Sequence, residues 1–208
     1  MKHMEILAKL FGGHARVKLM RLFLMNPEDV FDKLEVGKRS KVMGAMLSKE
    51  IRTLESIGLI TQRSVVKMYP KKSRKGNEFV KKKVMGYALN HAFPFLAALR
   101  ALVTEVTLGK EDIAARFKNC GQMKLIIIAG VIIDEMDSRV DILIVGDKLK
   151  KPVIEGVLKR LESELGKELT YGLMETSEFE YRFGIYDKFI RDIIDYPHLV
   201  VLNKLKLF

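Results

Sequence analysis

The sequence predicts an α/β protein, more narrowly of the α+β type, built from two domains. Its 208 residues exceed the usual size of one domain, about 100–150 residues. Helical periodicity dominates the first 60 residues, whereas continuous apolar β-branched runs begin only after residue 124. Charge divides the chain similarly, with 24 Lys and Arg against 11 Asp and Glu in residues 1–120, and 13 against 15 in residues 121–208. We therefore expect a basic domain at 1–90, a connecting helix at 91–109 and a near-neutral domain at 110–208.

The first 60 residues are expected to be mainly helical. Apolar residues recur at helical spacing, and the pairs Gly12-Gly13 and Asn26-Pro27 interrupt the pattern. Gly58 is placed to end the last helix as a C-cap, after which Leu59-Ile60 begins an extended segment. The expected helices cover residues 6–11, 17–24, 34–40 and 43–56.

A basic hairpin is expected next. Residues 64–69 and 79–89 alternate like strands, and the stretch 70–77 between them has the Pro, Ser, Gly and Asn residues of a turn. Only Glu78 is acidic between residues 63 and 83. Nine residues in that interval are basic: Arg63, Lys67, Lys71, Lys72, Arg74, Lys75, Lys81, Lys82 and Lys83.

This order of helices and hairpin, with the stretch from Val42 to Ile60, resembles the recognition helix and first wing strand of winged helix-turn-helix transcriptional regulators. The end of that stretch, Leu-Glu-Ser-Ile-Gly-Leu-Ile, is the most diagnostic part, and the resemblance covers about 90 residues. It implies that the second helix of the motif enters the major groove of double-stranded DNA and that the wing contacts an adjacent groove or phosphates. The implied DNA-contacting residues are Lys41, Ser48, Lys49, Arg52, Arg63, Lys71, Lys72, Arg74 and Lys75.

The first turn of this helix departs from the family pattern. Base-reading helices usually begin with polar residues, whereas residues 43–46 are Met-Gly-Ala-Met. Methionines in such a position are interpreted as core filler. The departure leaves open a domain used only for protein contacts or dimerisation.

Residues 93–106 are strongly apolar and are expected to form a linker or dimerisation helix. Their apolar face is broader than contact with one small core requires, so a homodimer is expected. The residues of that face are Phe95, Leu96, Leu99, Leu102, Val103 and Val106.

The remaining chain predicts a small mixed-sheet domain. Two buried neighbouring strands, 125–130 and 140–145, flank a charged turn at 134–139. Pro152 opens a helix that Gly166 ends. The other expected elements are helices at 110–118, from Thr176 and at 186–194, and a strand at 169–174.

Gly130, followed by Asp141-Ile-Leu-Ile144, is similar to the hallmark of DNA-polymerase-beta-like nucleotidyltransferases, over about residues 111–200. That superfamily uses grouped carboxylates to hold two Mg²⁺ ions. Here Val131 stands in place of the family's serine and Leu143 in place of the second carboxylate. The resemblance implies a degenerate domain with Gly130 and Asp141 as vestiges, no catalytic residue, no metal and no cofactor. Asp141 is interpreted as a relic, as a cap for the neighbouring loop, or as one ligand of a weak single-metal site.

Other residues carry little chemistry. The four histidines are scattered, and Cys120 is expected to be a structural thiol. Five aromatic residues between 181 and 196 are interpreted as core packing. No apolar run approaches the about 20 residues of a spanning helix, and the N-terminus has no signal-peptide pattern, so a cytoplasmic protein with no membrane partner is expected.

Together these features predict a DNA-binding transcriptional regulator. Its nucleotidyltransferase-like domain would be inactive as an enzyme and would serve sensing, dimerisation or partner contact, with a small-molecule or nucleotide effector left open. One alternative is an active Mg²⁺-dependent nucleotidyltransferase that draws ligands from Asp134, Asp137 or Asp147. Another is a non-specific DNA-binding or toxin–antitoxin-like interaction protein.

Overall fold

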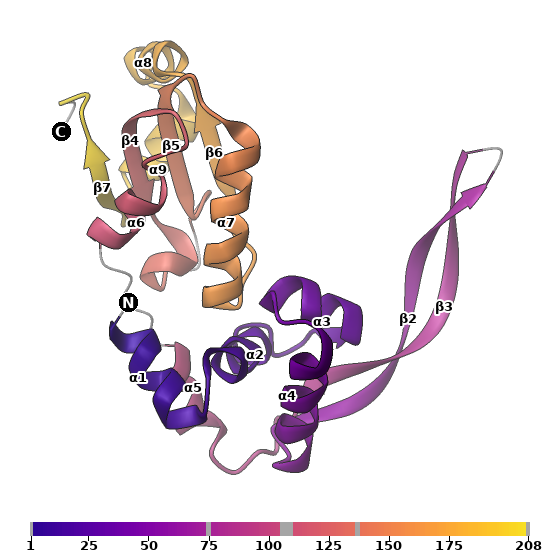
Figure 1. Ribbon diagram of the computed structural model, residues 1–208. Coiled ribbons are helices and arrows are strands. Elements are labelled where there is room, and N and C mark those ends of the chain that lie inside the picture. Colours follow the sequence, from indigo (N-terminus) through magenta and orange to yellow (C-terminus); the bar gives the residue numbers. More distant parts are fainter. Residues whose placement is uncertain (1, 74–75, 105–109, 136–137, 207–208) are drawn as a thin grey trace. The chain divides into compact units, whose positions relative to one another are not determined.

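The computed structural model describes residues 2–73, 76–104, 110–135 and 138–206. Helices and two separate β-sheets make up the chain, which confirms the α+β class (Figure 1). The chain divides into two compact units, residues 6–105 and residues 106–208 together with residues 1–5.

The N-terminal unit contains the predicted helices and a three-stranded antiparallel sheet of order β1-β3-β2. Strand β1 was not predicted, because three residues are too few to show a strand period. The elements are α1 (Lys2–Phe11), of which residues 6–11 belong to this unit, α2 (His14–Met25), β1 (Val30–Asp32), α3 (Lys33–Ser40), α4 (Gly44–Ser56), β2 (Ile60–Ser73), β3 (Gly76–Leu89) and α5 (Leu96–Thr104).

Helix α2 is the centre of this unit. Six consecutive residues, 19–24, are buried, so the helix has neighbours on nearly every side. One of them is Arg21, whose Nε donates a hydrogen bond of 2.7 Å to the carbonyl oxygen of Val103. In the other direction, Arg100 Nη2 donates to the carbonyl oxygen of Leu24 (3.1 Å). Both bonds satisfy carbonyls near helix ends, and they fasten α5 to α2.

Helices α3 and α4 are joined by a very short connection. Lys41 has a left-handed backbone (φ 55°), and the Ser40 hydroxyl donates to the Val36 carbonyl oxygen at 2.6 Å. Gly37 lets the helices approach closely, since a Cβ there would lie 3.0 Å from a methyl group of Leu47.

Helix α4 is also held by a buried carboxylate. Glu50 lies on its inner face, and Arg16 Nε of α2 donates to it at 2.7 Å. A buried carboxylate needs such a partner, so this pair fixes the rotation of α4 about its own axis. The opposite face of α4 is thereby turned to solvent.

The β2–β3 hairpin is longer than the sequence predicted. The stretch 70–77 was expected to be a turn, but β2 continues to Ser73 and β3 begins at Gly76. The expected turn residue Pro70 pairs with Phe79 inside the hairpin. Strand β2 lies at the edge of its sheet, where a residue without an N–H group is tolerated.

The C-terminal unit is a mixed four-stranded sheet of order β6-β5-β4-β7. Strands β5 and β6 are parallel and the other pairs antiparallel. Strand β7 was not predicted, although Leu-Val-Val-Leu at 199–202 carries a strand signal. The elements are α6 (Lys110–Arg116), β4 (Gln122–Ile128), the 3-10 turn η1 (Gly130–Ile133), β5 (Ile142–Asp147), α7 (Lys151–Leu165), β6 (Tyr171–Met174), α8 (Thr176–Gly184), α9 (Lys188–Ile194) and β7 (Leu199–Asn203).

Helices cover both faces of this sheet, which explains the unbroken apolar runs of β4 and β5. Ile126 and Ile144 point to the face covered by α6 and α7, and Leu125 and Leu143 to the face covered by α8 and α9. Cys120 is fully buried in the first of these cores, and burial raises its pKa, as expected of a structural thiol.

The expected aromatic core of the C-terminal region is only partly correct. Phe183 and Phe189 pack against the core beneath α8 and α9. Tyr181, Tyr186 and Tyr196 are exposed instead. Tyrosine tolerates exposure because its hydroxyl is polar, so helical spacing alone could not separate these residues from the core. Across the residues described, no helix has the length and apolar character needed to cross a bilayer.

Candidate nucleic-acid interface

The exposed face of α4 carries the cations that the sequence analysis predicted as DNA contacts. Lys49 and Arg52 are exposed there, opposite the buried side chains of Leu47 and Ile51. Ser48 is half-buried, and its hydroxyl donates to the carbonyl oxygen of Gly44 at 3.3 Å. The two cations are thus free to reach a ligand, whereas the Ser48 hydroxyl already has an acceptor. Lys41 is exposed in the turn before α4.

The methionines at the start of α4 do not fill the core, which corrects the interpretation from sequence. Met43 and Met46 are 76% and 52% exposed. The Arg16–Glu50 bond holds the face of α4 that carries Glu50 toward the core, so the two methionines on a different face of the helix remain exposed. An exposed apolar first turn can contact the methyl group of thymine but cannot donate hydrogen bonds to base edges.

The hairpin supplies the other candidate contacts. Arg63 is exposed near its base. Lys71 and Lys72 lie on β2, paired with Glu78 and Asn77, rather than in a loop. Arg74 and Lys75 lie outside the described residues. The structure adds three consecutive exposed cations that were not among the predicted contacts, Lys81, Lys82 and Lys83.

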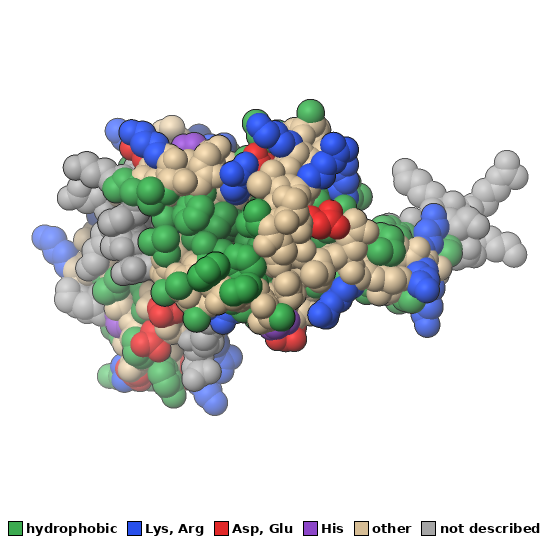
Figure 2. Space-filling model, turned by 90° about the horizontal axis from the view of Figure 1, so that it is seen from below, with side chains coloured by type: hydrophobic (Ala, Val, Ile, Leu, Met, Phe, Trp, Pro, Cys, Tyr) green, Lys and Arg blue, Asp and Glu red, His purple; other side chains and the backbone are tan. Residues whose placement is uncertain are grey.

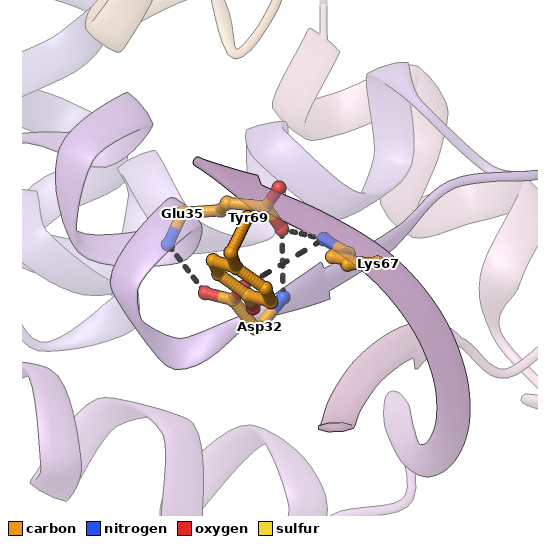
Figure 3. A network of polar contacts seen from close by, with 4 residues as sticks. All are labelled: Asp32, Glu35, Lys67 and Tyr69. Carbon is orange, nitrogen blue, oxygen red and sulfur yellow. Dashed lines mark hydrogen bonds and ion pairs between the residues drawn. The ribbon is translucent and has the colours of Figure 1, made fainter. Parts of the chain in front are cut away.

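A network of polar contacts joins this hairpin to the start of α3 (Figure 3). Asp32 caps α3, since its Oδ1 accepts from the Glu35 amide (2.9 Å) while Glu35 Oε2 accepts from the Asp32 amide (2.9 Å). Two side chains of β2 then bind these carboxylates. Lys67 Nζ donates to Glu35 and lies 3.9 Å from Asp32 Oδ2, and the Tyr69 hydroxyl donates to Asp32 Oδ2 at 2.7 Å.

The network raises the pKa of the Tyr69 hydroxyl. The hydrogen bond to the Asp32 carboxylate, with smaller contributions from burial and from the charge of Asp32, raises the pKa of Tyr69 above its usual value of 10. Tyr69 therefore stays protonated and remains a donor at physiological pH. Lys67 and Tyr69, which bond the hairpin to the start of α3, lie on the same face of the hairpin.

In the C-terminal unit Asp141 has a structural role. Its Oδ1 accepts from the Val131 amide at 2.8 Å, and its Oδ2 accepts from the Thr170 amide at 2.7 Å. The buried carboxylate thus joins η1 to the start of β6. Gly130 has a left-handed backbone (φ 57°) beside Asp141, and a Cβ at that position would collide with the carboxylate. Of the three interpretations of Asp141, a cap for the neighbouring loop agrees best with these contacts.

The structure describes two of the other carboxylates considered as metal ligands, Asp134 and Asp147. Asp134 ends η1 with a left-handed backbone (φ 63°), and Asp147 lies at the far end of β5, 4.0 Å from Lys124 Nζ. Asp137 lies outside the described residues. Among the residues that are described, His, Cys, Asp and Glu form no group of three or more that could hold a metal ion.

A cavity of about 470 Å³ opens at the end of β4 remote from Asp141. Three cations, Lys118, Lys124 and Lys204, line it together with apolar side chains such as Met123 and Leu202. The cavity is open to solvent on one side, and Lys124 lies 4.0 Å from Asp147 Oδ2, so Lys118 and Lys204 offer most of the positive charge to an anion. The sequence did not predict it, because the lysines come from three separate segments.

No family model, no curated protein and no solved structure matches the chain. The described residues place exposed cations on α4 and on the hairpin of the same unit.

Replacing Tyr69 by phenylalanine should loosen the hairpin, because Asp32 Oδ2 loses its closest hydrogen bond from β2. We expect faster amide hydrogen exchange in residues 62–69, measured by mass spectrometry, with α2 and α4 unaffected. Tyr87→Phe, a change of the same kind on β3, is the matched control. Equal exchange in the two variants would show that the network does not hold the hairpin.

Replacing Asp141 by alanine should lower the free energy of unfolding by about 2–4 kcal/mol, because two amides near it lose their acceptor. Urea unfolding followed by circular dichroism measures the change. Asp147→Ala, which removes only a half-exposed carboxylate, should cost less than about 1 kcal/mol. If Mg²⁺ stabilises the wild-type chain but not Asp141→Ala, Asp141 is a metal ligand and the structural role is wrong.

Proposed function

We propose that this chain is a DNA-binding transcriptional regulator and that residues 1–90 are a winged helix-turn-helix bound to duplex DNA. The observation that carries the proposal is the element order α2-β1-α3-α4-β2-β3, with exposed Lys49 and Arg52 on α4. In that arrangement α4 is the helix that would enter the major groove and the β2–β3 hairpin is the wing. The basic excess of residues 1–120 supports the same assignment, because cations that neutralise phosphates release condensed counterions.

The C-terminal unit, in this proposal, is not a catalyst. Nucleotidyl transfer through two metal ions needs several carboxylate oxygens facing the metals. Both oxygens of Asp141 already accept amide hydrogen bonds, and Leu143 is buried beneath α8 and α9. These contacts favour a unit that serves sensing or partner contact, and its lysine-lined cavity favours an anionic effector.

The proposed regulator is a homodimer that associates through α5. Val103 of the predicted face is buried, Leu96 and Leu99 are half-buried, and Val106 lies outside the described residues. Phe95 and Leu102 remain 69% and 50% exposed. Helix α1 of the same unit adds two exposed apolar residues, Ile6 and Leu10. Figure 2 shows hydrophobic side chains gathered on the underside of the molecule, a patch of the kind that marks protein interfaces.

Arg52→Ala in the full chain should weaken binding to a selected genomic fragment by about 1–3 kcal/mol and binding to random duplex by less, because it removes a base-reading contact. Lys82→Ala on the hairpin should weaken both alike. Fluorescence anisotropy gives the affinities, and Lys159→Ala on α7 of the other unit is the control. Affinity should also fall about 10³–10⁵-fold between 50 and 200 mM salt, as expected for about six to ten phosphate contacts. A flat salt response, or equal affinity for every sequence, would contradict the proposal.

Charge placed on α5 should separate the dimer. We expect the wild-type chain to scatter light as twice 23.8 kDa at micromolar concentration and Phe95→Glu with Leu102→Glu to scatter as a monomer, because both apolar side chains are exposed. Leu34→Glu, on an exposed leucine of α3, is the control and should leave the mass unchanged. A monomeric wild-type chain would contradict this assignment.

A further inference from the structure

The two faces of the β2–β3 hairpin differ in what they contact. Residues that alternate along a strand share a face with their cross-strand partners. The pairs Lys67–Lys82 and Tyr69–Val80 therefore share the inner face, from which Lys67 and Tyr69 bind Asp32 and Glu35. The pairs Ser64–Met85, Val66–Lys83 and Met68–Lys81 share the opposite face, which we call the outer face. Phe79, two residues before Lys81, also belongs to it.

The outer face is both apolar and basic. Its apolar side chains, Val66, Met68, Phe79 and Met85, are each 57–62% exposed. Lys81 and Lys83 are exposed between them. Residues 60–69 and 79–89 together contain five cations and no carboxylate. Figure 2 shows Lys and Arg side chains interspersed with hydrophobic ones on the projecting hairpin.

Burial of these side chains needs a partner, and the charge limits which partner fits. A second copy of the outer face would bring Lys81 and Lys83 against the same lysines, which repel. Basic protein surfaces would be disfavoured likewise. A polyanion with an apolar interior meets both requirements, since its charges neutralise the lysines while its interior receives the apolar side chains.

Duplex DNA is such a polyanion. The outer face from Ser64 to Met68 covers about 15 Å of β2. The undistorted minor groove, about 6 Å wide, is narrower than a two-stranded ribbon, so the duplex has to open and bend to receive this face. Minor-groove proteins combine lysines on phosphates with apolar wedges, often Phe or Met, that part base steps and kink the duplex by about 20–90°. Side chains without donors cannot hydrogen-bond to base edges, and apolar wedges that part base steps enter from the minor groove, so the composition of the outer face favours the minor groove.

We infer, on the basis of the proposed DNA binding, that the outer face of the β2–β3 hairpin lies in the minor groove and bends the duplex. Met68 and Phe79 would be the wedges between base pairs. The polar network on the inner face holds the hairpin in one direction relative to α3. The bend then occurs at a fixed distance from the base pairs contacted by α4. Specificity would come partly from the ease with which a sequence is deformed, which compensates for the apolar first turn of α4.

The test measures bending and affinity in the same complex. The full chain binds a 40-base-pair duplex labelled at both ends, and energy transfer reports the end-to-end distance while anisotropy reports affinity. We expect the wild-type chain to bend the duplex by at least about 20°. Met68→Thr with Phe79→Thr should remove most of the bend and keep the salt dependence, because the lysines remain. Lys81→Gln with Lys83→Gln should reduce the salt dependence.

Threonine suits an exposed strand, so the double variant should keep the circular dichroism spectrum and melting temperature of the wild type. Val153→Thr, at an exposed apolar residue of α7, is the matched control and should leave the bend unchanged. Binding without a bend, or an equal bend in the double variant, would overturn this inference and leave the proposed function intact. No binding by the wild-type chain would overturn both.

Two further outcomes would assign the outer face to another partner. If the double variant loses sedimentation with vesicles of phosphatidylserine and phosphatidylcholine while its DNA bend is unchanged, the face binds membranes. If the double variant has a smaller light-scattering mass than the wild type, the face joins two copies of the chain. Either result contradicts a minor-groove contact.

Discussion

Asp32 and Glu35 are each bonded to two parts of the chain at once. They cap α3 through their reciprocal amide bonds, and they receive Lys67 and Tyr69 from β2. Partly buried carboxylates need partners for each oxygen, so the cap and the contacts to the hairpin support one another. One pair of carboxylates thereby sets both the start of α3 and the direction of the hairpin. The direction of the outer face of the hairpin depends on that arrangement.

Much of the fold could be predicted from the sequence, because amphipathic helices and buried strands have periods that are read locally. Gly166 and Pro152, for example, mark the ends of α7 where they were expected. The hairpin was predicted too short, since Pro70 and Gly76 are turn formers and nothing local reveals that their neighbours pair across the hairpin. Strand β1 escaped prediction because its three residues form a strand only by pairing with β3.

The site was predictable to the extent that it lies on one helix. The spacing of the apolar residues of α4 shows which face of that helix is buried, and it thereby predicts that Lys49 and Arg52 are exposed. The polar network was not predictable, since Lys67 and Tyr69 are more than 30 residues away from the carboxylates that they bind. The same holds for Asp141, whose role depends on the amide of Thr170, 29 residues away. The sequence shows which chemical groups a residue carries, but contacts with residues far away in the sequence determine which role that residue has in the structure.

Helix α5 connects the proposed dimer to the proposed DNA contact through hydrogen bonds rather than through a flexible joint. Arg21 and Arg100 bond the ends of α2 and α5 to each other, and Arg21 is almost wholly buried. A buried guanidinium that loses its acceptor is costly, so sliding of α5 along α2 is opposed by the loss of these bonds. Two chains joined through α5 would therefore hold their α2 helices, and with them their α4 helices, at one separation. The spacing of the two half-sites in DNA would then be set by α2–α5 packing inside each chain, and an effector bound to the C-terminal unit would have to act on α5 to change it.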